Sequence, residues 1–318
     1  MAEMTAIDPR KAFEEALLQL GKENDKIVAV SCDSASGGGM GAFFKAYPER
    51  SVETGISEQN AIGICAALAK QGFIPVNVVI TPFITMRAYE QVRDDIGYMN
   101  TNVKLVGSGG GLAYSTLGST HEAIEDIALM RTIPNMTIFC PGDAYEVRQA
   151  LKLAVELNGP VYIRMPRQAR PYASDPEKRA LTAGKAEILR DGKDVALFTC
   201  GPMVEEAQTA AEILAGMGID TAIINLMTVK PLDEETIMQY IRKAKMLVTV
   251  EEHSVVNGLG SAIAQQKAPV KDAPPLYIMG IKEGSKTTGP YKEVLESYGL
   301  TGKRIAEQIC KYFKEAHI

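Results

Sequence analysis

The sequence has few histidines and no paired cysteines, which argues against the common metal and disulfide frameworks. It contains three histidines among 318 residues, and no two of them have the spacing of zinc ligands. The five cysteines form no CxxC pair, and most lie in apolar segments, a pattern typical of reduced thiols in the cytosol. We therefore expect no metal site in this chain and a cytoplasmic location.

Long apolar runs and concentrated positive charge are also missing. No run approaches the roughly 18 residues of a membrane span, because Thr81 and Pro82 interrupt the richest one. The N-terminal MAEMTAIDPRK lacks the basic-then-apolar order of a signal peptide. The net charge is -5, and the one basic cluster is Arg164, Arg167 and Arg170. We expect neither a membrane nor a nucleic acid as partner, since phosphate backbones require a concentrated positive face.

What is present is the balance of a globular protein, with 46% hydrophobic and 23% charged residues. Short apolar runs alternate with amphipathic stretches. Strands separated by helices require crossover connections, so this order predicts mainly parallel sheets covered on both faces. The predicted fold class is α/β, with two doubly wound domains. Expected strands are Ile27–Cys32, Pro75–Ile80, Val103–Val106, Thr137–Cys140, Val161–Met165, Asp194–Thr199, Thr221–Leu226, Met246–Val250 and Leu276–Met279. Expected helices are Pro9–Leu20, Ser57–Lys70, Phe83–Ile96, His121–Arg131, Ala144–Leu157, Val204–Ala215, Asp233–Ala244, Gly260–Gln266 and Gly302–Glu315.

The alternating pattern stops around Gln168–Thr182. Charged residues and two prolines in this stretch are typical of a linker that runs over a surface. We predict a first domain at 1–170, a linker at 171–184 and a second, smaller domain at 185–318.

A glycine-rich stretch follows the first expected strand. Gly37, Gly39 and Ala42 fit the dinucleotide-binding spacing. Pro48, however, shortens the helix that this motif requires, and Glu53 comes early for the acidic residue that should bind a ribose. A flexible loop beside a ligand is the favoured interpretation.

Three segments contain candidate functional residues, each with a structural alternative. Glu58 opens an apolar, buried helix, where an acid must be hydrogen-bonded or perturbed in pKa, although the helix dipole alone also favours it. Phe83, Met86 and Tyr89 recur at intervals of three, which places them on one helical flank and is more typical of a core. His121 stands at an expected helix start, where a structural role is the commoner one.

Together these segments resemble the middle and C-terminal domains of the transketolase family over nearly the whole chain. TGISEQNAIGICAALAKQG is similar to the family's glutamate motif, and GSTHEAIEDIALMRTIPNM to its histidine motif. VKPLDEE, LVTVEEH and NGLGSAIA are similar to its C-terminal domain. Three ordered motifs at family spacing make the resemblance specific.

The resemblance implies roles for eight residues around thiamine diphosphate and a sugar phosphate. Glu58 matches the glutamate that holds the pyrimidine ring nitrogen and so activates the cofactor for attack on a ketose carbonyl. His121 matches a histidine that contacts the transferred hydroxyketone unit. The matches to side chains around the pyrimidine are Phe83, Met86 and Tyr89, with Asp33 as an acid near the cofactor, and the matches to the arginines that bind the substrate phosphate are Arg10 and Arg167.

The resemblance also implies a partner. In the family, the diphosphate and Mg2+ site lies in an N-terminal domain that contains a Gly-Asp-Gly motif, and no such motif occurs here. The chain begins where the family's pyrimidine-binding domain begins. It is therefore expected to be the C-terminal subunit of a split transketolase, with the cofactor between chains in an α2β2 heterotetramer.

The implied reaction is transfer of a two-carbon ketol unit from a ketose phosphate to an aldose phosphate. Three alternatives stay open: a 1-deoxyxylulose-5-phosphate synthase-like reaction, which RAYEQV and IRMPR echo, a 2-oxo acid dehydrogenase β subunit, and a non-catalytic regulatory subunit. Gln59 replaces a histidine found in many members. GGGLAYSTLGSTH lacks the aspartate that touches a donor hydroxyl and a second histidine near the phosphate, so the donor stays open.

Overall fold

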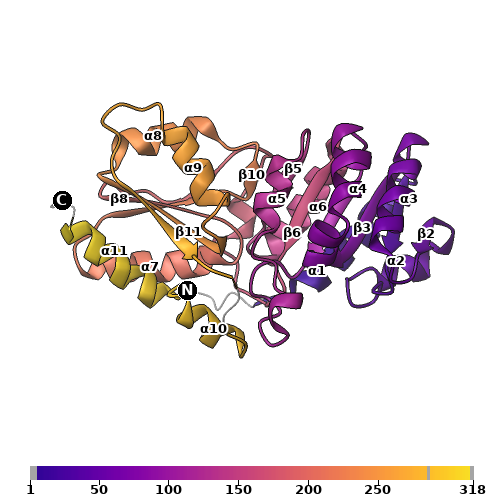
Figure 1. The fold of residues 1–318 in the computed structure, drawn as a ribbon, viewed down its shortest axis with the longest axis horizontal. Helices are drawn as coiled ribbons and strands as arrows, with labels where there is room; N and C mark the ends of the chain where they lie inside the picture. Colours follow the sequence, from indigo (N-terminus) through magenta and orange to yellow (C-terminus); the bar gives the residue numbers. More distant parts are fainter. Residues whose placement is uncertain (1–5, 285–286, 316–318) are drawn as a thin grey trace.

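The structure is a computed structural model that describes residues 6–284 and 287–315. The strands form two sheets, which lie side by side along the long axis of the molecule (Figure 1). The first sheet has seven strands in the order β10-β5-β6-β4-β3-β1-β2, and the second has five in the order β12-β11-β8-β9-β7. Both are mainly parallel, as the sequence predicts for an α/β fold.

The first sheet is parallel except at one edge, where β10 joins β5 in the antiparallel direction. Its strands are β1 (Ile27–Ser31), β2 (Ser51–Glu53), β3 (Ile74–Ile80), β4 (Lys104–Ser108), β5 (Thr137–Phe139), β6 (Val161–Met165) and β10 (Thr228–Lys230). Every residue of β1 is buried, because consecutive side chains enter the cores on opposite faces of the sheet. This burial explains why the strand reads as a continuous apolar run rather than an alternating one.

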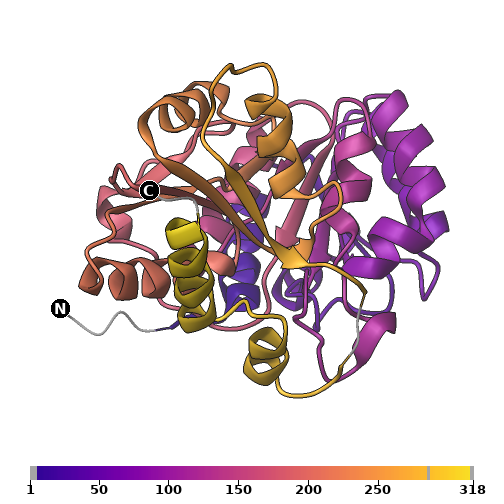
Figure 2. The same ribbon diagram turned by 60° about the vertical axis from the view of Figure 1, so that its left-hand side comes forward.

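The second sheet is likewise parallel except at β7, which pairs with β9 in the antiparallel direction. Its strands are β7 (Glu187–Arg190), β8 (Val195–Thr199), β9 (Thr221–Asn225), β11 (Met246–Ser254) and β12 (Leu276–Ile281). The helices around it are α7 (Met203–Gly216), α8 (Glu234–Lys243), α9 (Leu259–Lys267), α10 (Tyr291–Ser297) and α11 (Gly302–Glu315). In Figure 2, α11 stands in front of the strands of this sheet.

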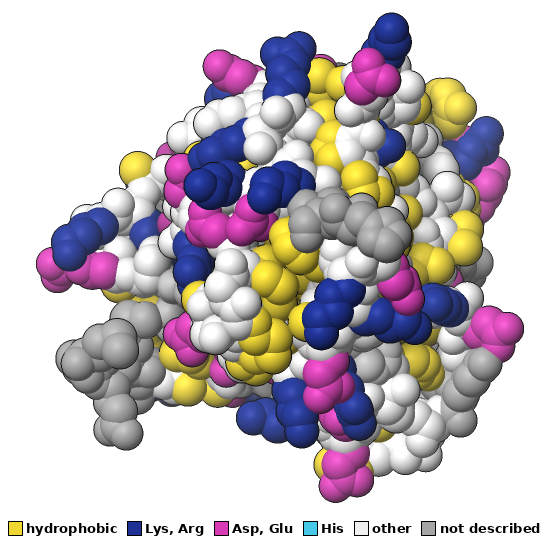
Figure 3. Space-filling model, turned by 90° about the vertical axis from the view of Figure 1, so that its left-hand side faces the viewer, with side chains coloured by type: hydrophobic (Ala, Val, Ile, Leu, Met, Phe, Trp, Pro, Cys, Tyr) yellow, Lys and Arg dark blue, Asp and Glu magenta, His cyan; other side chains and the backbone are white. Residues whose placement is uncertain are grey.

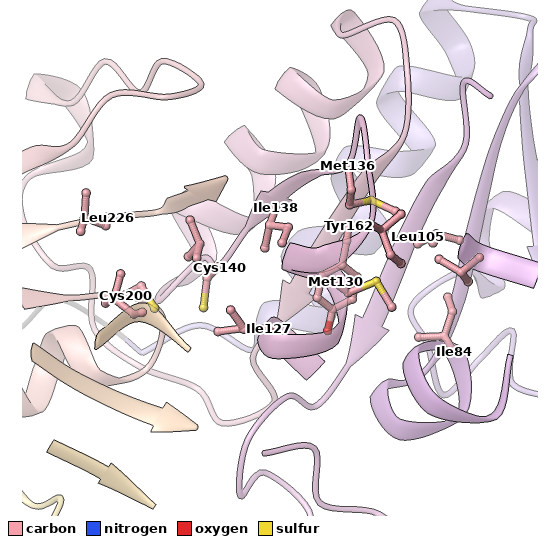
Figure 4. Close-up of a cluster of buried hydrophobic side chains, with 14 of the residues drawn as sticks. Ile84, Leu105, Ile127, Met130, Met136, Ile138, Cys140, Tyr162, Cys200 and Leu226 are labelled. Carbon is pink, nitrogen blue, oxygen red and sulfur yellow. The ribbon is translucent and has the colours of Figure 1, made fainter. Parts of the chain in front are cut away.

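Helices cover both faces of the first sheet. One face packs against α1 (Pro9–Glu23), α2 (Gly41–Ala46) and α6 (Ala144–Glu156), and the other against α3 (Glu58–Lys70) and α5 (Asp126–Thr132). The core on the α3 and α5 face continues into the second sheet, where it includes side chains of α8 and α9. Figure 4 follows this shared core from Ile84 through Tyr162 to Cys200 and Leu226.

A buried polar network reinforces the junction between the two sheets. Arg164 of β6 donates from Nε to the Asp126 carboxylate (2.8 Å) and from Nη2 to the carbonyls of Ala123 and Glu252 (3.0 Å each). Arg164 is 3% exposed and Asp126 is fully buried, so a charge on either requires the other. Because Glu252 belongs to β11, these bonds join the first sheet to the second.

Two predicted helices differ from the structure. The segment Phe83–Ile96 is not one regular α-helix: it consists of a π-helix η2 (Phe83–Arg87), a short α4 (Tyr89–Gln91) and a second π-helix η3 (Val92–Tyr98). The predicted helix His121–Arg131 was wrong at its start. A 3-10 turn η4 (Gly118–Thr120) precedes His121, and α5 begins only at Asp126.

Several short elements were not predicted, namely β2, β7, β10 and α10 together with the 3-10 turns η1 (Pro48–Arg50) and η5 (Pro176–Lys178). The predicted effect of Pro48 is confirmed, since α2 has six residues and ends at Ala46. The domain limits at 170 and 184 stay a prediction. The second-sheet region does send β10 into the first sheet, so the two sheets are not independent units.

The end of the second sheet presents side chains of both charges. In Figure 3, lysines and arginines alternate with aspartates and glutamates around a central strip of hydrophobic side chains. Across residues 6–284 and 287–315, every helix is too short or too polar to cross a membrane.

Candidate active site

The predicted site residues gather at one edge of the first sheet, where its parallel strands have their carboxyl ends. Phe83 follows β3, His121 follows β4 and Arg167 follows β6. The chain turns to β2 on one side of β1 and to β3 on the other, so the strand order reverses there. Crevices at such a reversal point are the usual ligand sites of open α/β sheets.

Glu58 is the first residue of α3, as predicted, and is 5% exposed. Ser57 precedes it but gives the helix no side-chain cap, because its hydroxyl donates to the Thr54 carbonyl instead (2.9 Å). Within the described part of the chain, the Glu58 carboxylate has one hydrogen bond, from Arg87 Nη1 to Oε1 (3.0 Å). A buried acid with an incomplete set of partners is suited to bind a further polar group.

Arg87 connects Glu58 to the aromatic part of the site, a role that no sequence motif indicated. Its guanidinium carbon lies 4.1 Å from the centroid of the Phe83 ring, a cation–π contact. Gln59 donates from Nε2 to the Arg87 carbonyl (3.3 Å). Spacing along a regular α-helix could not predict these contacts, because Phe83–Arg87 is a π-helix.

His121 lies between two aromatic rings. Its ring centroid is 5.3 Å from that of Phe83, with the rings nearly perpendicular, and 6.1 Å from that of Tyr114. Its Nδ1 pairs with the hydroxyl of Thr120 (2.9 Å). His121 therefore links the Glu58 end of the site to Tyr114, which sequence reasoning did not single out.

Tyr89 and Met86 lie on the same segment as Phe83 but have different surroundings. Tyr89 shares a hydrogen bond with Thr132 at the C-terminal end of α5 (2.7 Å), whereas Phe83 contacts His121 before the N-terminal end of that helix. Met86 is half-buried. Ala88, which lies between η2 and α4, has non-helical φ and ψ of -104° and 21°. The prediction of one helical flank fails because the segment changes helix type at this residue.

Arg10 and Arg167 line one cavity of about 230 Å3. They come from opposite ends of the first-sheet region, Arg10 from the start of α1 and Arg167 from the segment after β6. The other side chains and backbone of the cavity wall belong to Ser34, Gly37, Gly38, Val78, Val79, Ile80, Ser108 and Tyr114. The Ser34 hydroxyl is buried and has no hydrogen bond to any residue that the structure describes. Two guanidiniums and an unsatisfied hydroxyl group suit an anionic ligand.

The two arginines differ in whether an acidic side chain forms a salt bridge with them. Arg10 donates from Nη2 to the Asp8 carboxylate (2.8 Å) and from Nε to the same side chain (3.3 Å). Burial alone would raise the pKa of Asp8, but the hydrogen bonds from Arg10 and the charges of Arg10 and Arg167 lower it. Asp8 is thus ionised and neutralises Arg10. Arg167 forms no salt bridge with a described residue, so Asp8 offsets only one of the two arginine charges and the cavity has a net positive charge near one.

Asp33 is exposed at the end of β1, in the left-handed region with φ 56°. Its backbone N–H donates to the Glu53 carboxylate (2.6 Å), which also accepts from the Gly55 N–H (3.0 Å). Burial would raise the pKa of Glu53, but these backbone bonds hold it below its ordinary value. Glu53 therefore stabilises the turns before Glu58, and the predicted cofactor role of Asp33 stays a prediction.

Two observations limit where other ligands could bind. A cavity of about 450 Å3 lies against β12, α10 and α11, and no predicted site residue lines it. In residues 6–284 and 287–315, no group of three or more His, Cys, Asp or Glu side chains could hold a metal ion. Of the predicted site residues, Arg10 and Arg167 line the smaller cavity at the strand reversal. Tyr114 of the same cavity connects it through ring contacts to His121 and then to Phe83.

Two known families match the chain in consecutive segments. Residues 5–171 match the family described as "Transketolase, pyrimidine binding domain", and residues 184–305 match "Transketolase, C-terminal domain". A solved structure described as "Split gene transketolase, inactive beta4 tetramer" superposes with a TM-score of 0.88 at 36% identity, over 98% of this chain and 99% of that chain.

Similar proteins include subunits of two transketolases and a synthase. The chain is 38% identical to the 6-deoxy-6-sulfo-D-fructose transketolase subunit SqwH of Clostridium sp. strain MSTE9, over 93% of this chain and 91% of that protein. It is 35% identical to one of the apulose-4-phosphate transketolase subunits of Phocaeicola vulgatus, over 96% and 97%. A 1-deoxy-D-xylulose-5-phosphate synthase of Caldanaerobacter subterraneus subsp. tengcongensis is 35% identical over 95% of this chain, which spans 48% of that enzyme.

Proposed function

The chain belongs to the transketolase family, and we propose that it is the pyrimidine-binding subunit of a thiamine-diphosphate-dependent enzyme that transfers a two-carbon ketol unit between sugar phosphates. The observation that carries this proposal is the continuous series of contacts from Glu58 to Arg167. Glu58 accepts a hydrogen bond from Arg87, whose guanidinium lies over the Phe83 ring. The Phe83 ring contacts that of His121, which in turn lies near the Tyr114 ring. The Tyr114 hydroxyl accepts a hydrogen bond from Arg167. One end of this series offers a buried acid and the other an anion-binding cavity.

The residues present fit the pyrimidine half of the cofactor. A buried carboxylate with one hydrogen bond can hold a proton at a ring nitrogen, and aromatic side chains suit a flat heterocycle. In this proposal Glu58 holds the ring nitrogen, and Phe83, Met86 and Tyr89 surround the ring, with Asp33 nearby. The cofactor, when bound, supplies the nucleophilic carbon that attacks the ketose carbonyl.

The substrate residues complete the proposal. Arg10 and Arg167 bind the substrate phosphate in the cavity that they share. His121 lies between that cavity and Phe83, so it contacts the hydroxyketone unit that is transferred. The names of similar proteins support an anionic tail, since one acts on a sulfonated sugar and another on a phosphorylated one.

Activity should require a second polypeptide. The chain has no Gly-Asp-Gly motif, and its described part has no carboxylate cluster for Mg2+. A similar structure that contains β chains alone is described as inactive, which supports a need for a partner. We infer that an N-terminal transketolase subunit supplies the diphosphate and Mg2+ ligands in an α2β2 heterotetramer in the cytoplasm.

Reconstitution tests this function. The chain is mixed with a candidate N-terminal transketolase subunit from the same organism, thiamine diphosphate, Mg2+, xylulose 5-phosphate and ribose 5-phosphate, and sedoheptulose 7-phosphate is measured. We expect product only when both chains are present. Glu58→Gln should lower turnover by about 10²–10⁴-fold, because it removes the proton-exchanging group. The matched control Glu90→Gln, at an exposed acid of the neighbouring α4, should leave turnover unchanged.

The second candidate is a synthase-like reaction, favoured by the identity to 1-deoxy-D-xylulose-5-phosphate synthases. Both reactions would use the same residues of this chain. The same mixture with pyruvate and glyceraldehyde 3-phosphate separates them. Consumption of pyruvate without formation of sedoheptulose 7-phosphate would replace the transketolase assignment by the synthase one.

A further inference from the structure

Tyr114 joins the anion cavity to the rest of the site. Its hydroxyl oxygen accepts a hydrogen bond from Arg167 Nη1 (2.7 Å), and the guanidinium carbon of Arg167 lies 4.3 Å from the centroid of its ring. The same ring is 6.1 Å from that of His121. Tyr114 therefore stands between the predicted carbon-transfer end of the site and the residues that would bind the tail of the substrate.

The direction of the Arg167–Tyr114 bond fixes what the hydroxyl can still do. A guanidinium has no acceptor, so the tyrosine oxygen accepts and its own hydrogen stays available. Tyr114 lines the cavity with Arg10 and Arg167, so its hydroxyl hydrogen can be donated to an anion bound there. A hydroxyl that accepts from a cation is also polarised toward donation.

The absence of a side chain at Gly109 leaves space for the Tyr114 ring. Gly109 has φ 75°, and a Cβ atom at this position would lie 2.3 Å from Cε2 of Tyr114. Any larger residue at 109 would displace the ring and with it the hydroxyl. The position of Tyr114 is therefore determined by its close contact with Gly109 and by its hydrogen bond with Arg167.

The charge balance of the cavity leaves hydrogen bonds to an anion that neutral donors can make. Asp8 neutralises Arg10, so the two arginines together provide only about one net positive charge. A tetrahedral oxyanion presents three free oxygens, and a phosphate ester near neutral pH has more than one negative charge. Neutral hydroxyl donors supply the remaining hydrogen bonds without further charge.

We propose that Tyr114 is a specificity-determining residue whose hydroxyl donates to the tetrahedral oxyanion, phosphate or sulfonate, at the tail of the substrate. This inference rests on the proposed function for the identity of the substrate, but the anion site itself can be tested on the chain alone. Tyr114→Phe removes the donor and keeps the ring. Tyr98→Phe, at an exposed tyrosine, is the matched control.

The first test uses inorganic phosphate as the probe. Ligand binding to the folded state raises the thermal midpoint, and its concentration dependence gives the dissociation constant. Tyr114→Phe should weaken phosphate binding by the isolated chain about tenfold, the usual loss for one hydrogen bond to a charged group, and Tyr98→Phe should not change it. Sulfate, which imitates a sulfonate, is the parallel arm. If Tyr114→Phe weakens the binding of only one of the two anions, that anion identifies the tail of the substrate. If it weakens the binding of neither, the proposal is overturned.

The second test uses the reconstituted complex. Tyr114→Phe should raise KM for a phosphorylated donor about tenfold at unchanged kcat, and it should leave hydroxypyruvate, a donor without a tail anion, unaffected. An equal loss with both donors would show that Tyr114 only supports the fold. If no donor is turned over, the proposed function fails, while the phosphate measurement still decides the role of Tyr114. Gly109→Ala, which displaces the ring, should reproduce the loss of phosphate binding.

Discussion

At the residue scale, the site depends on which charges have partners. Glu58 is buried and bonded only to Arg87 in the described chain, whereas Arg87 is 47% exposed at its side chain. Removal of Arg87 would leave the buried Glu58 carboxylate without this hydrogen-bond donor, which carries a desolvation cost. Arg87 therefore stabilises the chain before any ligand binds.

Arg87→Met tests this role. We expect the free energy of unfolding of the isolated chain to fall by about 1–3 kcal/mol, because a buried carboxylate loses its hydrogen-bond donor. Arg93→Met is the matched control, since Arg93 pairs with the exposed acids Glu90 and Asp94 and should change stability by less than about 0.5 kcal/mol. Urea unfolding measures both, and equal effects would contradict the special role of Arg87.

Arg167→Ala tests the substrate end of the same site. Loss of charge-assisted bonds to the tail anion should raise KM for phosphorylated sugars by a factor that corresponds to about 1.5–3 kcal/mol. Steady-state kinetics of the reconstituted complex measure it. If unphosphorylated donors lost as much, Arg167 would not bind the phosphate.

At the element scale, the regular elements were predictable and the irregular ones were not. Strands such as Val161–Met165 and helices such as Gly302–Glu315 agree residue for residue, because periodicity and turn residues mark them locally. The segment 83–98 has the same apolar pattern as an α-helix, and its π-turns depend on contacts with other elements. β10 could not be predicted either, since its partner β5 lies about 90 residues earlier in the chain.

The same limit applies to the site. Glu58, Phe83, His121, Arg10 and Arg167 were predicted because they match family motifs. Arg87 and Tyr114 carry no local signal, and their contacts with Glu58 and Arg167 form only when separate strand ends meet. Asp8 differs, because it caps the start of α1 and pairs with Arg10 two residues later.

The packing of η3 on the segment after α5 gives an element-scale prediction. A Cβ atom on Gly97 would lie 2.2 Å from Cγ2 of the buried Ile133, so Gly97→Ala should lower the free energy of unfolding by about 1–3 kcal/mol. Gly63→Ala on α3 is the control. No atom outside its own helix backbone lies within 4 Å of that position, so the change should raise stability by about 0.5–1 kcal/mol. Destabilisation by both substitutions alike would contradict this packing.

At the scale of the whole molecule, a buried ionic cluster joins the linker to both sheets. Arg179 contacts Asp143 (2.8 Å), Glu146 and Glu187 (2.6 Å), and Asn225 also donates to Glu146 (2.6 Å). Asp143 and Glu146 belong to the first-sheet region, and Glu187 and Asn225 to the second. Three carboxylates around one arginine leave excess negative charge in a buried place.

Glu146 should make stability depend on pH. Burial, followed by the charge of Asp143, raises the pKa of Glu146 from 4.5 to about 7 in the folded chain. Folding therefore favours the protonated form of Glu146. The resulting contribution to the free energy of unfolding is complete below pH 4.5 and is lost as the pH rises through about 7. Relative to Glu146→Gln, the wild-type chain should lose stability between pH 5 and pH 8. Chemical unfolding at both pH values measures this, and a constant or opposite difference would contradict the cluster's charge imbalance.

The most direct test of the whole account is a structure of this chain in complex with its N-terminal partner, thiamine diphosphate and Mg2+. We predict that a Glu58 carboxylate oxygen lies at hydrogen-bond distance, about 2.6–3.2 Å, from the pyrimidine ring nitrogen. The diphosphate should be held by the partner chain. The account would be contradicted by a pyrimidine bound away from Glu58, or by a diphosphate bound entirely within this chain.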